Sequence, residues 1–135
     1  MYEKILLAVD GSENAKRAAK HAIQMASLNS NASVKIIHVI DLSKVKSEVL
    51  NPDLKEEREK RLKEVESAFK KAHVSYDIKI EHGEPGPTIV TYANSRQFDL
   101  VIVGSRGLNS LQEMVLGSVS HKVAKRVKCP VLIIK

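Results

Sequence analysis

Two glycine-bearing segments near the C-terminal end of the chain have the residue types and spacing of an anion-binding site. Gly104–Gly107 reads Gly-Ser-Arg-Gly, and nine residues later comes Gly117-Ser118. Glycines there let backbone N–H groups approach an anion without an intervening Cβ, and let loop residues adopt positive φ. Ser118 opens a helical pattern, and a helix N-terminus adds unpaired N–H groups and the positive end of a dipole. The spacing therefore predicts a phosphate cradle made from two turns.

Within this cradle, the expected donors are backbone N–H groups around the two turns and the hydroxyl of Ser118, while Arg106 is its one strong cation. The Arg106 guanidinium could meet a phosphate at two points at once, and a solvent-facing loop arginine is the alternative. The segment is neither a Walker A loop nor the Gly-x-Gly-x2-Gly dinucleotide fingerprint. The predicted donor positions are Gly104, Gly107, Gly117, Ser118 and Val119.

A second polar position, Asp10, follows the first apolar run and directly precedes Gly11-Ser12. Asp and Ser both cap helices frequently, so either residue could serve only to start the next helix. The two roles are compatible if Ser12 caps and Asp10 faces a ligand. The five histidines share no metal-ligand spacing, and His38 reads as a strand residue satisfied by its neighbours.

The elements that must position these residues begin with five short apolar runs rich in β-branched side chains. Four are nearly continuous in apolar character, as strands buried on both faces should be. The third alternates strictly between apolar and polar residues, which predicts an edge strand. The five runs are Ile5–Val9, Val34–Ile40, Tyr76–Ile80, Leu100–Val103 and Val131–Ile134.

Helical patterns separate the strands. Alanines between Ala15 and Ala26 recur at helical spacing and form a stripe that should let the first helix lie close to a sheet. Further helices are predicted to begin near Pro52, after Gly86-Pro87 and at Ser118, whereas 41–51 lacks a clear period and is predicted to be a mobile connection. Alternating strands and helices predict a doubly wound, open parallel α/β sheet with helices on both faces.

Composition limits the class of protein. A chain of 135 residues is most simply one domain, and no apolar run approaches the ~20 residues of a membrane helix. Cys129 is the only cysteine, which favours a reducing compartment and a cytoplasmic location, and it reads as a small buried hydrophobe. The net charge is +6, but much of the basic excess lies in 55–71 and 122–128 with the pattern of solvated helix faces. With three tyrosines, two phenylalanines and no tryptophan for base stacking, nucleic-acid binding is not expected.

Three separated signatures resemble the universal stress protein family: the Gly-x2-Gly-x9-Gly-Ser spacing, Asp10-Gly11-Ser12, and Cys129-Pro130-Val131. The resemblance runs from Lys4 to Lys135 and implies a Rossmann-like sheet with strand order 3-2-1-4-5. In an open α/β sheet the ligand crevice lies at the carboxyl ends of the strands where the order reverses. In the implied order those ends carry Asp10 and Gly104.

The same resemblance implies ATP, with or without Mg²⁺, as the ligand. It places Val39 at the adenine, with Ala8 and Val9 beside it, and gives Asp10 a contact to the ribose or to the metal ion. It also implies a homodimer, formed through the last strand; the residues concerned are Val131, Leu132, Ile133 and Ile134. An apolar edge strand invites such pairing because its backbone groups are otherwise unpaired.

Three functions are consistent with these residues. The preferred one is a nucleotide-dependent regulatory protein of the stress response with at most weak ATPase activity. A slow ATP hydrolase is the second, although Arg106 has no evident water-activating base beside it. The third is a dimeric interaction module that never fills the crevice.

Overall fold

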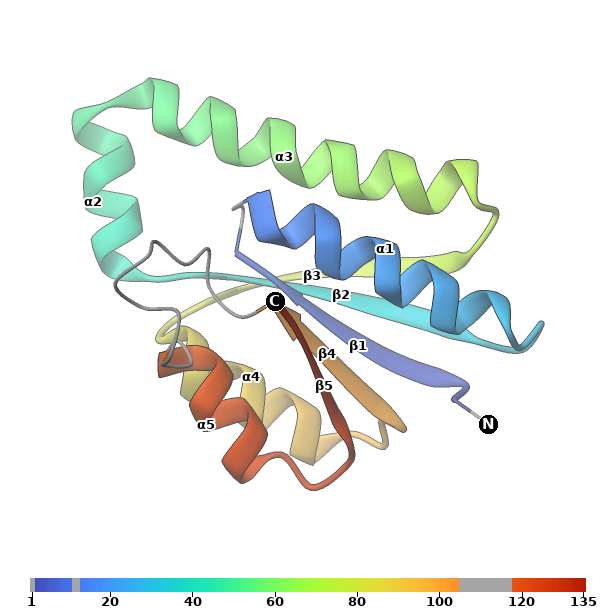
Figure 1. Cartoon of the computed structure of the whole chain (residues 1–135). Helices are drawn as coiled ribbons and strands as arrows, with labels where there is room; N and C mark the ends of the chain where they lie inside the picture. Colours follow the sequence, from blue (N-terminus) through green and yellow to red (C-terminus); the bar gives the residue numbers. More distant parts are fainter. Residues whose placement is uncertain (1, 11–12, 105–117) are drawn as a thin grey trace.

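The five predicted strands form one parallel sheet with order β3-β2-β1-β4-β5 (Figure 1), which confirms the predicted doubly wound architecture. The computed structural model describes residues 2–10, 13–104 and 118–135. In chain order the elements are β1 (Lys4–Val9), α1 (Glu13–Ser27), β2 (Ser33–Ile40), α2 (Leu42–Leu50), α3 (Pro52–Lys71), β3 (Ser75–His82), α4 (Pro85–Ser95), β4 (Leu100–Gly104), α5 (Ser118–Arg126) and β5 (Val131–Ile134).

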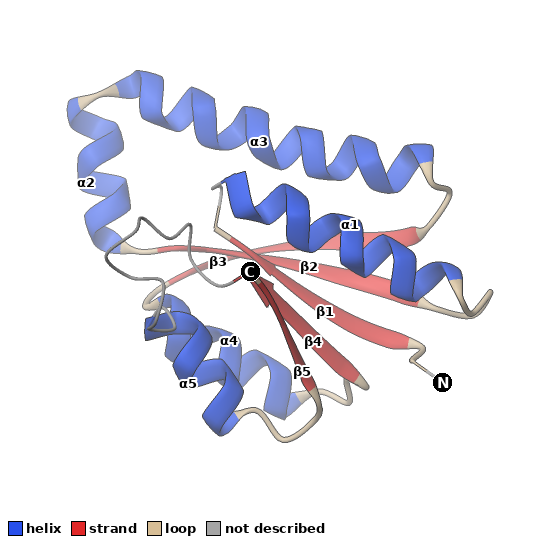
Figure 2. Ribbon diagram, in the orientation of Figure 1, coloured by secondary structure: helices blue, strands red, loops and turns tan. Residues whose placement is uncertain are grey.

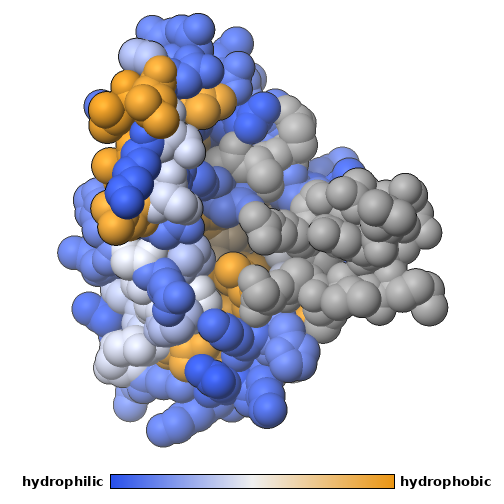
Figure 3. Space-filling model, turned by 90° about the vertical axis from the view of Figure 1, so that its left-hand side faces the viewer, coloured by the Kyte–Doolittle hydropathy of each residue, from blue (hydrophilic) through white to orange (hydrophobic). Residues whose placement is uncertain are grey.

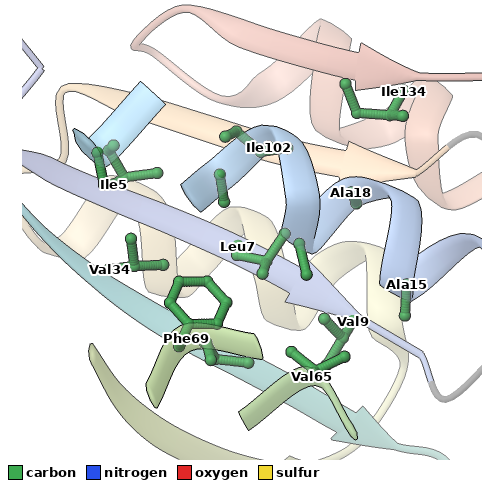
Figure 4. Packing of buried hydrophobic residues seen from close by; sticks show 14 of the residues in the cluster. Ile5, Leu7, Val9, Ala15, Ala18, Val34, Val65, Phe69, Ile102 and Ile134 are labelled. Atoms are coloured by element: carbon green, nitrogen blue, oxygen red, sulfur yellow. The ribbon is translucent and has the colours of Figure 1, made fainter. Parts of the chain in front are cut away.

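Helices cover both faces of the sheet, as Figure 2 shows: α1 and α3 lie on one face, and α4 and α5 lie on the other. Successive strand residues point to opposite faces. β1 accordingly sends Leu7 and Val9 into the core under α1 and α3, and Leu6 and Ala8 into the core under α4 and α5. In Figure 4 the Phe69 ring of α3 lies against the first of these cores.

The alanine stripe of α1 is buried, as predicted. Ala18 and Ala22 have no exposed surface, and their small side chains let α1 pack directly onto the sheet. The two edges of the sheet are as expected, β3 from its alternating pattern and β5 from the family resemblance: among the described residues, β3 pairs only with β2 and β5 only with β4. None of the helices in the described ranges is both long and apolar enough to cross a membrane.

The prediction for 41–51 is wrong, because this segment contains helix α2. Asp41 caps the helix by accepting a hydrogen bond from the backbone N of Lys44 at 2.7 Å. The amphipathic period is weak because three of the four apolar residues of α2 are exposed and its one buried residue is Glu48. Leu42, Val49 and Leu50 are 68%, 75% and 86% exposed. Figure 3 looks onto this side of the molecule and shows hydrophobic residues at its surface.

Candidate functional site

A cavity of about 250 Å³ opens at the carboxyl edge of the sheet, where β1 and β4 lie side by side and the strand order reverses. This is the position that the sequence predicts for a ligand crevice. Residues from seven of the ten elements or their adjoining turns line it. The cavity therefore depends on how the helices are held against the strand ends as well as on the strands themselves.

One side of the cavity is aliphatic. Ala8 and Val9 of β1, Val39 of β2 and Val103 of β4 are all buried strand residues, and Ile89 of α4 joins them. A wall of this kind suits the flat, apolar faces of an aromatic ring. The family resemblance implied a base pocket at Val39, Ala8 and Val9, and the structure brings all three to this cavity.

The polar side is built by the end of β1 and by α2. Asp10 follows β1, and its carbonyl oxygen accepts a hydrogen bond from Lys44 Nζ at 2.7 Å. Asp41 and Lys44 both line the cavity, and both were missed because α2 was predicted to be an irregular connection. Asp41 directly after a strand is a candidate helix N-cap, and this signal could have identified α2.

Gly104 ends β4 at the cavity wall. Its carbonyl oxygen accepts a hydrogen bond from Ser120 Oγ at 2.8 Å, which holds the first turn of α5 against the strand. A Cβ at Gly104 would lie 3.4 Å from the Cβ of Asn14, an ordinary contact, and its φ is not positive. Among the described residues, therefore, no atom obstructs a side chain at this position. Close approach of a ligand is the role that the sequence predicts for this glycine.

The structure thus gathers Asp10, Val39, Gly104 and Val119 around one cavity, although they are far apart in the sequence. Ser118 begins α5 beside them. The remaining predicted residues, Arg106, Gly107 and Gly117, lie outside the described residues. Within the described ranges no cluster of three or more His, Cys, Asp or Glu side chains could hold a metal ion by itself.

Beneath the polar side, His38 of β2 is completely buried. Its Nδ1 lies 3.0 Å from the carbonyl oxygen of Val9, and its Nε2 lies 3.4 Å from Nη1 of Arg58. Burial lowers the pKa of His38 and outweighs the hydrogen bond to Val9, which raises it; Lys44 and Arg58 lower it further. The expectation that His38 is satisfied by its neighbours is confirmed.

Arg58 of α3 also forms a two-bond ion pair with Glu48 of α2. Arg58 Nε donates to Glu48 Oε1, and Arg58 Nη2 donates to Oε2 at 3.2 Å. The two side chains are only 11% and 9% exposed, so the solvated face predicted for 55–71 is wrong at Arg58. The hydrogen bond from Arg58 holds the pKa of Glu48 below its ordinary value. Nothing in the spacing of the two residues distinguishes this pair from the exposed charges around it.

The comparisons with known proteins agree with this geometry. A model of the universal stress protein family matches residues 1–135. Universal stress protein YxiE of Bacillus subtilis is 35% identical, with the full length of both chains covered. The solved structure of hypothetical protein MJ0577 has a TM-score of 0.81 and 34% identity, covering 100% of this chain and 96% of that one. A universal stress protein solved in complex with cAMP has a TM-score of 0.73 and 28% identity, covering 99% and 97%.

Proposed function

This chain belongs to the universal stress protein family, and from that membership and the geometry of its cavity we propose that it binds an adenine nucleotide. ATP is the expected ligand, and the protein acts as a nucleotide-dependent regulator in the stress response. The relative solved with cAMP supports an adenine nucleotide as the ligand class.

In this proposal the base occupies the aliphatic side of the cavity. Val39 and Val103 come from strands on either side of β1, so a planar ring between them would be enclosed by buried side chains. Asp10, at the end of β1, contacts the ribose. Its position between the aliphatic wall and Lys44 Nζ suits a group that carries hydroxyls.

The phosphates are assigned to the end of β4 and the start of α5. Gly104 supports this placement, and so do the unpaired N–H groups that the first turn of a helix such as α5 offers to an anion. Arg106, Gly107, Gly117 and the Ser118 hydroxyl complete the proposed cradle. Any Mg²⁺ would arrive with the nucleotide and neutralise part of the phosphate charge.

The proposal rests mainly on the position of Gly104 in the cavity wall, and Gly83 offers a matched control. Gly83 has a φ of +148°, and a Cβ there would lie 3.0 Å from Thr88 Oγ1, so the fold itself requires that glycine. Gly83 also lies outside the residues that line the cavity. We expect Gly104→Ala to keep the stability of the parent within about 0.5 kcal/mol but weaken ATP binding roughly tenfold, because a methyl group then separates the ligand from the backbone. Gly83→Ala should do the reverse.

The experiment is a calorimetric titration of nucleotide-stripped protein with ATP and magnesium, paired with urea unfolding of both variants. Saturable binding that Gly104→Ala weakens and Gly83→Ala leaves intact supports the proposal. Equal affinity in Gly104→Ala and the parent would place the phosphates elsewhere. A flat titration of the parent would leave the interaction module as the working function.

We further propose that the protein forms homodimers through β5. This strand pairs only with β4, and Val131, Leu132 and Ile133 remain partly exposed although apolar. Such an edge can pair with the same strand of a second copy. Leu132→Lys should give monomers in sedimentation velocity, whereas Leu28→Lys, at a leucine that is 82% exposed after α1, should not. A dimer that survives Leu132→Lys at micromolar concentration would exclude this edge.

A further inference from the structure

The hydrogen bonds of His38 fix which of its nitrogens carries the proton. The carbonyl oxygen of Val9 can only accept, so Nδ1 is the protonated nitrogen. Arg58 can only donate, so Nε2 must offer its lone pair. The site therefore holds a neutral imidazole with both nitrogens satisfied, which is the condition for burying it without cost.

Arg58 uses the opposite edge of its guanidinium to hold α2. Nε and Nη2 face Glu48, and Nη1 faces His38, so one planar group connects β2 to α2. A second bond, from Lys44 Nζ to the Asp10 carbonyl, fixes the first turn of α2 to the end of β1. These two connections set where α2 lies, and with it the two residues that α2 and its cap contribute to the cavity, Asp41 and Lys44.

Protonation of His38 is incompatible with this arrangement. An Nε2–H would face Nη1–H of Arg58, placing two donors and two positive charges 3.4 Å apart in a buried position. The charged groups around the ring are Arg58 from α3, Lys44 from α2 and Asp10 at the end of β1. Glu48 is already engaged by Arg58 through both oxygens. The guanidinium must therefore move, and Glu48 and α2 are the parts attached to it.

We propose that His38 is a positioning residue for the cavity. Its neutral ring holds Arg58, and through Arg58 and Glu48 it holds α2 beside the cavity, so nucleotide affinity falls when the ring gains a proton. This inference rests on the proposed nucleotide site and adds a dependence on acidity to it. His38 itself does not line the cavity, and its effect on a ligand passes through α2.

The test compares the parent with two single variants. His38→Asn keeps an N–H donor for Val9 and removes the titrating ring, and His21→Asn removes an exposed histidine of α1 as the matched control. ATP with magnesium is titrated into each protein by calorimetry at about pH 7.5 and about pH 5.5, so that protonation of the nucleotide itself cancels between proteins. We expect the dissociation constant of the parent to rise roughly threefold to tenfold more than that of His38→Asn, since one pKa unit of coupling is a tenfold change. His21→Asn should behave as the parent does.

A ligand-free measurement on the parent separates the two proposals. The imidazole Hε1 signal of His38 and the backbone amides of Leu42–Leu50 are followed by NMR as the pH falls, with circular dichroism to confirm that the chain stays folded. If the His38 signal and the α2 amides change with the same midpoint, at a pH below 6.5 and before the chain unfolds, the positioning role is supported. Titration of His38 without movement of the α2 amides, or protonation only on unfolding, would overturn it. ATP binding with parallel pH profiles in the parent and His38→Asn would also overturn it and leave the nucleotide site intact. Absence of ATP binding at the higher pH would instead refute the proposed function.

Discussion

At the amino end of the sheet the polar groups form a closed hydrogen-bonded set with the backbone, whereas at the carboxyl end the hydrogen-bonded polar groups also line a cavity. Asp99 precedes β4 at the amino end, where its Oδ2 accepts hydrogen bonds from the backbone N of Glu3 and of Lys4 at 3.0 and 2.9 Å. Its own N donates to the Lys4 carbonyl at 2.8 Å, which completes a closed set. At the opposite end, Asp10 and Lys44 line a cavity bounded by aliphatic side chains.

The two ends of the sheet therefore have different roles: the amino end stabilises the fold, and the carboxyl end forms the proposed binding site. The amino end is closed by groups whose partners are the backbone itself, and it can change only by losing stability. At the carboxyl end α2 is attached by long side chains, so its position depends on the charge states of His38 and Glu48. Changes at the two ends should therefore have separable effects on unfolding and on nucleotide affinity.

The largest effect on stability is expected at the amino end, at Phe69. The ring is fully buried near the end of α3 and lies 5.6 Å, centroid to centroid, from Tyr76 near the start of β3. Phe69→Ala should cost about 3–5 kcal/mol in the free energy of unfolding, because it leaves a cavity under α3. Urea unfolding measures this, and ATP affinity per folded molecule should be unchanged. A large loss of affinity in the folded fraction would contradict the separation of the two ends.

The next effect is expected at the carboxyl end, at the ion pair between Arg58 and Glu48. Arg58→Met should cost about 2–4 kcal/mol because Glu48, only 9% exposed, loses the partner that bonds both its oxygens, and the double variant with Glu48→Met should recover most of that loss. Unlike Phe69→Ala, Arg58→Met should also weaken ATP binding, because α2 loses its attachment.

The loss of stability in Arg58→Met should depend on pH. The pKa of Glu48 is lowered in the folded chain, so the pair contributes stability above the ordinary value of 4.5, and this contribution is lost as the pH falls through the lowered pKa. The difference in unfolding free energy between the parent and Arg58→Met should therefore shrink in acid. A difference that is constant with pH would show that Arg58 acts through packing alone.

Hydrophobic patterning predicted the strands, whereas their order, and with it the place of the cavity, came from the family resemblance. The predictions of an irregular segment at 41–51 and of a solvated side chain at Arg58 were wrong, because both features depend on contacts between segments. The exposed apolar residues of α2 hide its period, and the burial of Arg58 requires Glu48 and His38 to meet it from two other elements. Lys44 was missed for the same reason. Of the predicted site residues, Asp10, Val39 and Gly104 lie at strand ends, and the topology of the sheet brings them to one cavity.

The smallest effect is expected at Asp99. Hydrogen bonds from the backbone of Lys4 and Glu3 lower the pKa of its carboxyl group, but the side chain is exposed. Asp99→Asn should cost less than about 1 kcal/mol near neutral pH. That cost should shrink below the ordinary value of 3.8 and vanish as the pH falls through the lowered pKa, because the carboxylate of the folded parent is then lost as well. Thermal unfolding across pH measures this, and any effect on ATP affinity would contradict the assignment of the amino end to stability.

The most direct test of the account maps where an adenine nucleotide binds. Two-dimensional NMR of isotope-labelled, nucleotide-stripped protein, titrated with ATP and magnesium, reports every assigned backbone amide. We expect the largest shifts at Ala8, Val39 and Val103, with the amide signals of Phe69 and Asp99 unmoved. Shifts centred on the amino end, or the absence of saturable shifts at the carboxyl end, would contradict it.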